Sequence, residues 1–188
     1  MQNNHNSLLD MPQHTVAFSG YRPQKLPHGC TDEVQTELSL LLKEEIHRLY
    51  MNGYRVFLNG MMSGWDILAA EAVLSLQADH TNLYCVSIAP FKKDYFANNN
   101  WNAEWKARAR QVCQQSDLGI SLSENYTSGT YYARDRYLVD HASLLIAYYD
   151  GKPGGTQYTC DYAAKKGLSI VNLAIKYRGS PQQPFFVE

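Results

Sequence analysis

Short apolar runs alternate along the chain with longer segments whose apolar side chains recur every three or four residues. The short runs have the length of strands, and the periodic segments have the pattern of helices that bury one face. The predicted strands cover residues 14–18, 54–58, 83–88, 117–122, 143–148 and 168–173. The predicted helices begin near residues 32, 66, 103, 131 and 156, and they end near residues 52, 77, 114, 141 and 167.

This alternation predicts an α/β fold in three layers, with a mainly parallel sheet and helices on both of its faces. The run 143–148 is apolar throughout, which is typical of a parallel strand buried on both sides. A chain of 188 residues, 45% of them hydrophobic, fits one domain. We place that domain at residues 14–177, between a polar N-terminal tail, 1–13, and a C-terminal tail, 178–188.

Two glycine-rich turns precede predicted helices. The first spans residues 59–66 and includes Gly60 and Gly64, and the second contains Gly154 and Gly155. Glycines let backbone N–H groups converge, and a helix N-terminus carries partial positive charge, so such a turn suits an anion. The alternative is that the glycines serve turn geometry alone. Both turns fall at the carboxyl edge of the predicted sheet, together with the loops at 19–22 and 90–91, and ligands bind at that edge in such sheets.

Composition narrows the classes of partner and cofactor. The net charge of −1 lacks the basic footprint of a dedicated nucleic-acid binder, so the sequence disfavours nucleic acid as a partner. The four cysteines are scattered and no histidine cluster is present, so we predict no metal site. The polar N-terminal stretch has neither a signal-peptide pattern nor a membrane span. We therefore expect a cytoplasmic protein without a membrane partner, and a homo-oligomer is compatible with the sequence.

Several enzyme motifs are missing. The chain has no P-loop, no G-x-G-x-x-G after a strand and no G-x-S-x-G. These absences disfavour a P-loop NTPase, a dinucleotide oxidoreductase of the usual type and a triad hydrolase.

Charged side chains near the predicted edge suggest how a ligand is held. Arg22, in a proline-containing loop, suits bidentate contact with phosphate, although a salt bridge to Asp66 or Asp140 is the alternative. Asp66 stands at a helix start, where a carboxylate caps N–H groups or accepts from a ribose hydroxyl. Glu71 lies more than a turn further on and is a weaker candidate for a general acid or base.

A short predicted helix carries Arg134, Asp135, Arg136 and Asp140. Arg136 and Asp140 are four residues apart, so they share a face and can pair with each other. In the alternative, Arg136 clamps a phosphate and Asp140 fixes its rotamer.

Four segments together resemble the YpsA-like branch of the SLOG superfamily, a Rossmann-like group that also contains the SMF/DprA proteins and the LOG phosphoribohydrolases. Residues 18–26 are similar to that branch's T-G-H-R-P loop, 60–66 to its G-x-x-x-G-x-D, 136–140 to its N-R-Y-M-V-D, and 154–156 to its glycine-rich turn. Tyr21, Asn59 and Asp135 depart from the usual His, Gly and Asn. The resemblance implies a single-domain Rossmann-like fold that binds nucleotides or nucleotide-derived ligands.

The LOG activity is not carried over to this chain. The LOG enzymes have a glutamate shortly after the threonine of P-G-G-x-G-T-x-x-E, whereas Tyr158 and Thr159 stand where that acid would fall.

The leading hypothesis is a sensor or regulator that binds a nucleotide-derived ligand of the ADP-ribose or dinucleotide type. One alternative is a hydrolase of an N-glycosidic or phosphate bond in such a ligand, with Asp66 or Glu71 in a catalytic role. A third reading is a DprA-like module for single-stranded DNA. The predicted ligand-binding residues are Ser19, Gly20, Tyr21, Arg22, Gly60, Ser63, Gly64, Asp66, Pro90, Arg136, Asp140, Gly154, Gly155 and Thr156.

Overall fold

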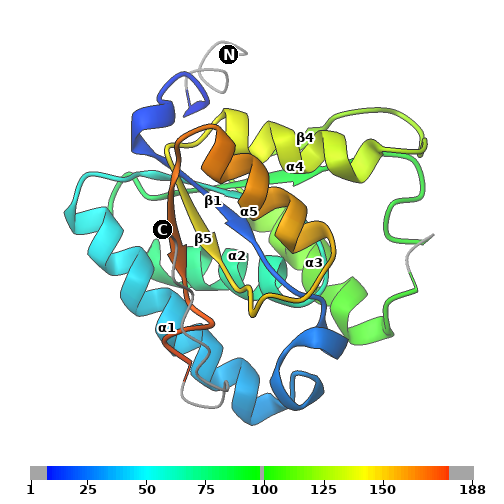
Figure 1. Ribbon diagram of the computed structural model, residues 1–188, viewed down its shortest axis with the longest axis horizontal. Coiled ribbons are helices and arrows are strands. Elements are labelled where there is room, and N and C mark those ends of the chain that lie inside the picture. Colours follow the sequence, from blue (N-terminus) through cyan, green and yellow to red (C-terminus); the bar gives the residue numbers. More distant parts are fainter. Residues whose placement is uncertain (1–7, 98–99, 178–188) are drawn as a thin grey trace.

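Six parallel strands form the centre of the protein in a computed structural model that describes residues 8–97 and 100–177. The spatial order is β4-β3-β2-β1-β5-β6 (Figure 1). The strands are β1 (Thr15–Ser19), β2 (Val56–Asn59), β3 (Tyr84–Ala89), β4 (Leu118–Ser121), β5 (Leu144–Ala147) and β6 (Ser169–Asn172). Every strand pair is parallel, so the predicted α/β fold with a mainly parallel sheet is confirmed.

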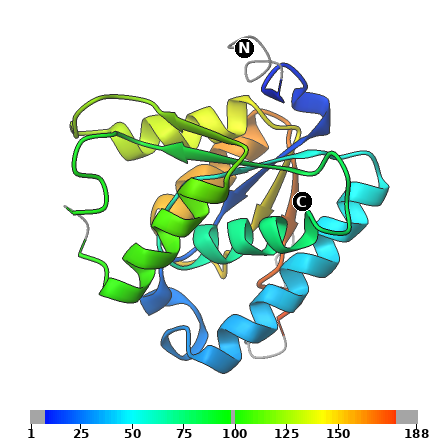
Figure 2. The same ribbon diagram turned by 180° about the vertical axis from the view of Figure 1, so that it is seen from behind.

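Five α-helices cover the two faces of the sheet: α1 (Asp32–Met51), α2 (Trp65–Leu76), α3 (Ala103–Gln115), α4 (Thr130–Asp140) and α5 (Gly155–Lys165). Helices α1, α2 and α3 pack on one face, and α4 and α5 pack on the other (Figures 1 and 2). Alternate residues of one strand enter different cores, because Val16 and Phe18 of β1 face the first set of helices and Ala17 faces the second. The prediction of three layers is thereby confirmed.

The loop after β1 is more regular than predicted. We interpret its two prolines and its glycine as excluding regular structure, but two short 3-10 helices occur at Pro23–Lys25 and Pro27–Gly29. Each begins with a proline, whose missing N–H is not needed at the start of a helix. A third 3-10 helix, Pro12–His14, precedes β1.

The N-terminal stretch that the sequence marked as a polar tail contacts the domain in its described part. Leu8 and Leu9 pack against the core beneath α4 and α5. The rest of that stretch, residues 1–7, and the C-terminal tail, 178–188, lie outside the described residues.

The strand order creates one point where the direction of winding reverses. The chain moves outward from β1 through β2, β3 and β4 and then returns to place β5 on the other side of β1. The loops after β1 and β5 therefore lead to helices on opposite faces of the sheet, and ligands of such sheets bind at this point. No helix in the described ranges is both long and apolar enough to cross a membrane.

Candidate functional site

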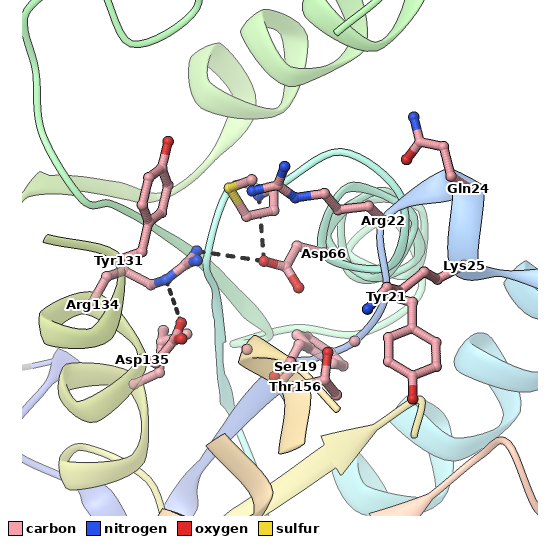
Figure 3. A pocket seen from close by; sticks show the side chains of 16 residues that line it. Ser19, Tyr21, Arg22, Gln24, Lys25, Asp66, Tyr131, Arg134, Asp135 and Thr156 are labelled. Atoms are coloured by element: carbon pink, nitrogen blue, oxygen red, sulfur yellow. Dashed lines mark hydrogen bonds and ion pairs between the residues drawn. The ribbon is translucent and has the colours of Figure 1, made fainter. Parts of the chain in front are cut away.

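A cavity of about 410 Å³ lies at the carboxyl end of β1, where the winding reverses (Figure 3). Its walls come from the loop after β1, the start of α2, one face of α4 and the start of α5. The lining residues are Phe18, Ser19, Gly20, Tyr21, Arg22, Gln24, Lys25, Met62, Asp66, Tyr131, Arg134, Asp135, Leu138, Gly154, Gly155 and Thr156. Residues from four distant parts of the sequence thus meet at one site.

Two cations stand at the exposed rim. The side chain of Arg22 projects over the cavity, and its guanidinium makes no hydrogen bond or ion pair within the described ranges (Figure 3). The Nζ atom of Lys25 donates to the carbonyl of Pro153 at 3.1 Å and lies 5.8 Å from the ring centre of Tyr21. Both cations retain donors for an anionic ligand.

Tyr21 holds the loop after β1 against the loop after β5. Its hydroxyl donates to Asp150 Oδ1 at 2.6 Å and accepts from the N–H of Lys152 at 3.2 Å. Burial, followed by the hydrogen bond to Asp150, raises the pKa of this phenol. Tyr21 therefore fixes the wall that carries Arg22 and Lys25.

The N-terminus of α5 opens into the cavity. Among the described residues, the N–H groups of Gly155, Thr156 and Gln157 have no backbone partner, and no side chain caps the helix. The hydroxyls of Thr156 and Ser19 also make no hydrogen bond in that part of the chain, and both residues line the cavity. Free amides, a hydroxyl and the helix dipole together suit a phosphate oxygen.

The first glycine-rich turn differs from the second, because three of the N–H groups there bond to internal acceptors. The N–H of Met61 donates to Asn59 Oδ1 at 3.2 Å, that of Met62 to Asp66 Oδ2 at 3.3 Å, and that of Trp65 to the carbonyl of Tyr21 at 3.0 Å. Gly60, Ser63 and Gly64 do not line the cavity.

Gly64 serves close packing. Its φ is +89°, and a Cβ there would lie 2.6 Å from the Tyr21 carbonyl oxygen. The start of α2 thus packs against the loop after β1 and supports it, and the glycines expected to form a phosphate cradle lie outside the cavity.

A buried arginine forms the floor of the cavity. Arg134 Nε donates to Asp135 Oδ1 at 2.8 Å, and Arg134 Nη1 donates to the carbonyl of Gly60 and lies 3.5 Å from Asp66 Oδ2 (Figure 3). Burial raises the pKa of Asp66 to about 6, because desolvation outweighs the nearby charge of Arg134. The salt bridge between Arg22 and Asp66, which the sequence left open, is therefore wrong. The cation that pairs with Asp66 is Arg134.

The structure places Arg136 and Asp140 outside the cavity. Arg136 is exposed, and its Nη1 donates to the hydroxyl of Tyr158 at 2.9 Å. Asp140 pairs with Lys166 Nζ at 2.7 Å, so it pairs neither with Arg136 nor with Arg22. Successive helical residues turn by about 100°, so residues 134 and 136 lie on nearly opposite sides of α4. The cavity is therefore lined by Arg134, and Arg136, the predicted clamp, does not line it.

Two further candidates also lie away from the cavity. Glu71 pairs with Arg108 Nη2 at 2.6 Å and ties α2 to α3. Pro90 is buried, and its carbonyl accepts from the hydroxyl of Ser123 at 3.1 Å. Neither residue lines the cavity, so neither has access to a ligand there.

Comparison with known proteins decides the family. Residues 16–176 match the family model described as the YspA SLOG family. The chain belongs to this family.

Within the described residues of this SLOG chain, no group of three or more His, Cys, Asp or Glu residues could hold a metal ion.

Curated relatives share sequence with this chain, and solved structures share its fold. A UPF0398 protein of Bacillus cereus is 25% identical over 160 residues, which cover 81% of this chain and 83% of the relative. DNA processing protein A from Helicobacter pylori, whose structure is described as showing a single-stranded DNA binding mode, has a TM-score of 0.57 at 19% identity. That match covers 87% of this chain and 66% of the other.

The same protein from Streptococcus pneumoniae, DprA, has a TM-score of 0.56 at 16% identity, with coverage of 87% and 50%. The chain therefore spans half to two-thirds of the DprA chains, and the likeness establishes the shared fold.

The SLOG motifs identify only part of the cavity. Of the predicted ligand-binding residues, Ser19, Gly20, Tyr21, Arg22, Asp66, Gly154, Gly155 and Thr156 line it. The predicted list lacks Phe18, Gln24, Lys25, Met62, Tyr131, Arg134, Asp135 and Leu138, which also line it. Residues 131, 134, 135 and 138 follow the spacing of one helix face, so this periodicity could have identified them.

Proposed function

We propose that this SLOG chain binds a nucleotide or nucleotide-derived ligand, of the ADP-ribose or dinucleotide type, and acts as a sensor or regulator. The observation that supports binding is the convergence on one cavity of the free α5 amides, the Thr156 hydroxyl and the rim cations Arg22 and Lys25. A cavity of about 410 Å³ lies within the range of small-ligand sites. A regulatory role is supported by a lining that contains no His or Cys to act as base or nucleophile.

A thermal-shift and calorimetry panel of ADP, ADP-ribose and dinucleotides tests this proposal. A ligand at about 100 times its Kd stabilises the folded chain by about 2.7 kcal/mol. We expect binding to weaken at least tenfold in the double variant Arg22→Ala with Lys25→Ala. Lys165→Ala is the matched control, because Lys165 is an exposed cation at the far end of α5. Lack of stabilisation by every ligand, or an unchanged response in the double variant, would refute the proposal.

A hydrolytic function is the second candidate, and Asp66 is the residue that favours it. This carboxyl lines the cavity, and its pKa of about 6 lies near the range of a general acid or base. Incubation with ADP-ribose, followed by chromatography, would show product release if the chain hydrolyses the ligand. At saturating ligand, Asp66→Asn should then abolish turnover. If the wild-type chain binds the ligand without turnover, the hydrolytic function is refuted and only the sensor role remains.

Single-stranded DNA binding is the third candidate, and it rests on the fold shared with DprA. The net charge of −1 argues against it, because non-specific DNA affinity comes from neutralising phosphates. We expect fluorescence anisotropy with a labelled oligonucleotide to show no saturation at physiological salt. Saturable binding that weakens steeply with salt would favour the DNA-binding function instead.

A further inference from the structure

The floor of the cavity holds one guanidinium between two carboxylates. The side chains of Asp66, Arg134 and Asp135 are 7%, 6% and 12% exposed. Their mutual contacts use Arg134 Nε and Nη1, Asp66 Oδ2 and Asp135 Oδ1. Arg134 Nη2, Asp66 Oδ1 and Asp135 Oδ2 have no partner within the described ranges, and all three residues line the cavity. A ligand that enters the cavity meets one donor group flanked by two acceptors.

The charge of this floor does not suit a phosphate. When both carboxylates are ionised, the three side chains sum to one negative charge, so an anion placed there would be repelled. The rim differs, since Arg22, Lys25 and the α5 N-terminus are all positive in character. The cavity thus has a cationic rim and a floor suited to neutral polar groups.

Hydroxyl groups complement the floor. A hydroxyl group both donates and accepts hydrogen bonds. It can therefore donate to a carboxylate while its oxygen accepts from Arg134 Nη2. A pair of adjacent hydroxyls can use both carboxylates at once. In a nucleotide such a pair is the 2′,3′-diol of the ribose, which lies close to the phosphates that the rim would bind.

We propose that Asp66, Arg134 and Asp135 form a subsite for the cis-diol of a ribose, and that the attached phosphates bind at Lys25 and the N-terminus of α5. This inference rests on the proposed function and specifies the part of the ligand that enters the cavity. Gly60 is needed for the subsite, because a Cβ there would lie 2.6 Å from Arg134 Cζ. Asp135, which stands where the family motif usually has Asn, is the specificity-determining residue of this subsite.

ADP and 2′,3′-dideoxy-ADP form the decisive pair of probes, because they carry the same charge and differ only in the diol. Hydrogen bonds to charged groups contribute enough that we expect calorimetry to show ADP binding about 10- to 100-fold more tightly. Asp135→Asn should reduce this ratio to below about threefold, since an amide retains an acceptor for Arg134 Nε but removes the charge. Asp161→Asn, an equal charge change at an exposed position of α5, should leave the ratio unchanged.

The results with these two probes distinguish failure of the diol subsite from failure of nucleotide binding as a whole. Equal affinity for the two probes in the wild-type chain would overturn the diol subsite and leave nucleotide binding intact. Failure of both probes to bind would also overturn it, and nucleotide binding would fall only if ADP-ribose and the dinucleotides failed as well. If Asp135→Asn does not fold, as judged by circular dichroism, Asp66→Asn replaces it, and the wild-type ratio alone can still refute the inference.

Discussion

Individual residues at the site are constrained by lack of space as much as by chemistry. Gly60 follows β2 and lies against Arg134, whose Nη1 donates to the Gly60 carbonyl. A Cβ at residue 60 would lie 2.6 Å from Arg134 Cζ and 2.7 Å from Asp66 Oδ2. The glycine that suggested a phosphate cradle in the sequence instead makes room for a buried ion cluster.

Gly60→Ala should therefore lower stability, because both charged groups that the methyl displaces are buried. We expect a loss of about 1–3 kcal/mol in the free energy of unfolding, measured by urea denaturation. Gly119→Ala is the control, since a Cβ there meets no atom within 4 Å. Equal effects of the two substitutions would contradict the packing argument.

The carboxyl of Asp66 links stability to pH. Burial raises its pKa to about 6, above the value of about 3.9 for an unfolded chain. Between these values the folded chain keeps a proton that the unfolded chain releases, so the free energy of unfolding falls as pH rises through this window. Asp66→Asn cannot ionise, and it should lack this decrease.

Urea unfolding of both proteins at about pH 4 and about pH 7 measures the effect. The stability of the wild-type chain relative to Asp66→Asn should be lower at the higher pH. A relative stability that does not change, or that rises with pH, would show that Asp66 ionises normally.

At the scale of elements, the two glycine-rich turns have different roles although they look alike in sequence. At the turn before α2, the N–H groups of Met61, Met62 and Trp65 bond to Asn59, Asp66 and the Tyr21 carbonyl. The turn before α5 leaves the amides of Gly155, Thr156 and Gln157 without a partner among the described residues. Gly155 and Thr156 also line the cavity, whereas Gly60, Ser63 and Gly64 do not, so we expect anion binding at α5.

Thr156→Val tests the role of α5, because valine keeps the shape of threonine but lacks the hydroxyl. Loss of one hydrogen bond should weaken ADP binding about threefold to tenfold in calorimetry. The melting temperature should change little, since the hydroxyl has no partner in the described part of the chain. Thr36→Val, at an exposed site on α1, is the control. Unchanged ADP affinity in Thr156→Val would exclude this hydroxyl from the site.

Across the whole molecule, the sheet joins the two cores and brings the site together at one edge. Trp65 and Trp105 report on the core beneath α1, α2 and α3, whereas α4 and α5 cover the other core. Strands such as β1 contribute side chains to both cores, so neither face can unfold alone without exposing the other.

Cooperative unfolding follows from this arrangement. We expect tryptophan fluorescence and far-ultraviolet circular dichroism to give coincident urea transitions. A fluorescence transition that precedes the loss of helix signal would show that the two faces unfold independently.

Hydrophobic patterning alone determined the elements and the class of fold. Every predicted strand and helix is present, because alternation of apolar runs with amphipathic segments has one compact solution, a parallel sheet covered on both faces. The carboxyl edge as the place of the cavity also follows from sequence order, since parallel strands end together there. Ser19, Arg22 and Thr156 were identified in this way.

Only the tertiary structure decided which side chains face the cavity. The choice between Arg134 and Arg136 depends on the rotation of α4, which is set by packing against α5 and the sheet. The role of the first glycine turn depends on its contact with the loop after β1, which lies far away in sequence. Sequence order determines where the chain ends each strand, whereas long-range packing determines which polar groups remain free to bind a ligand.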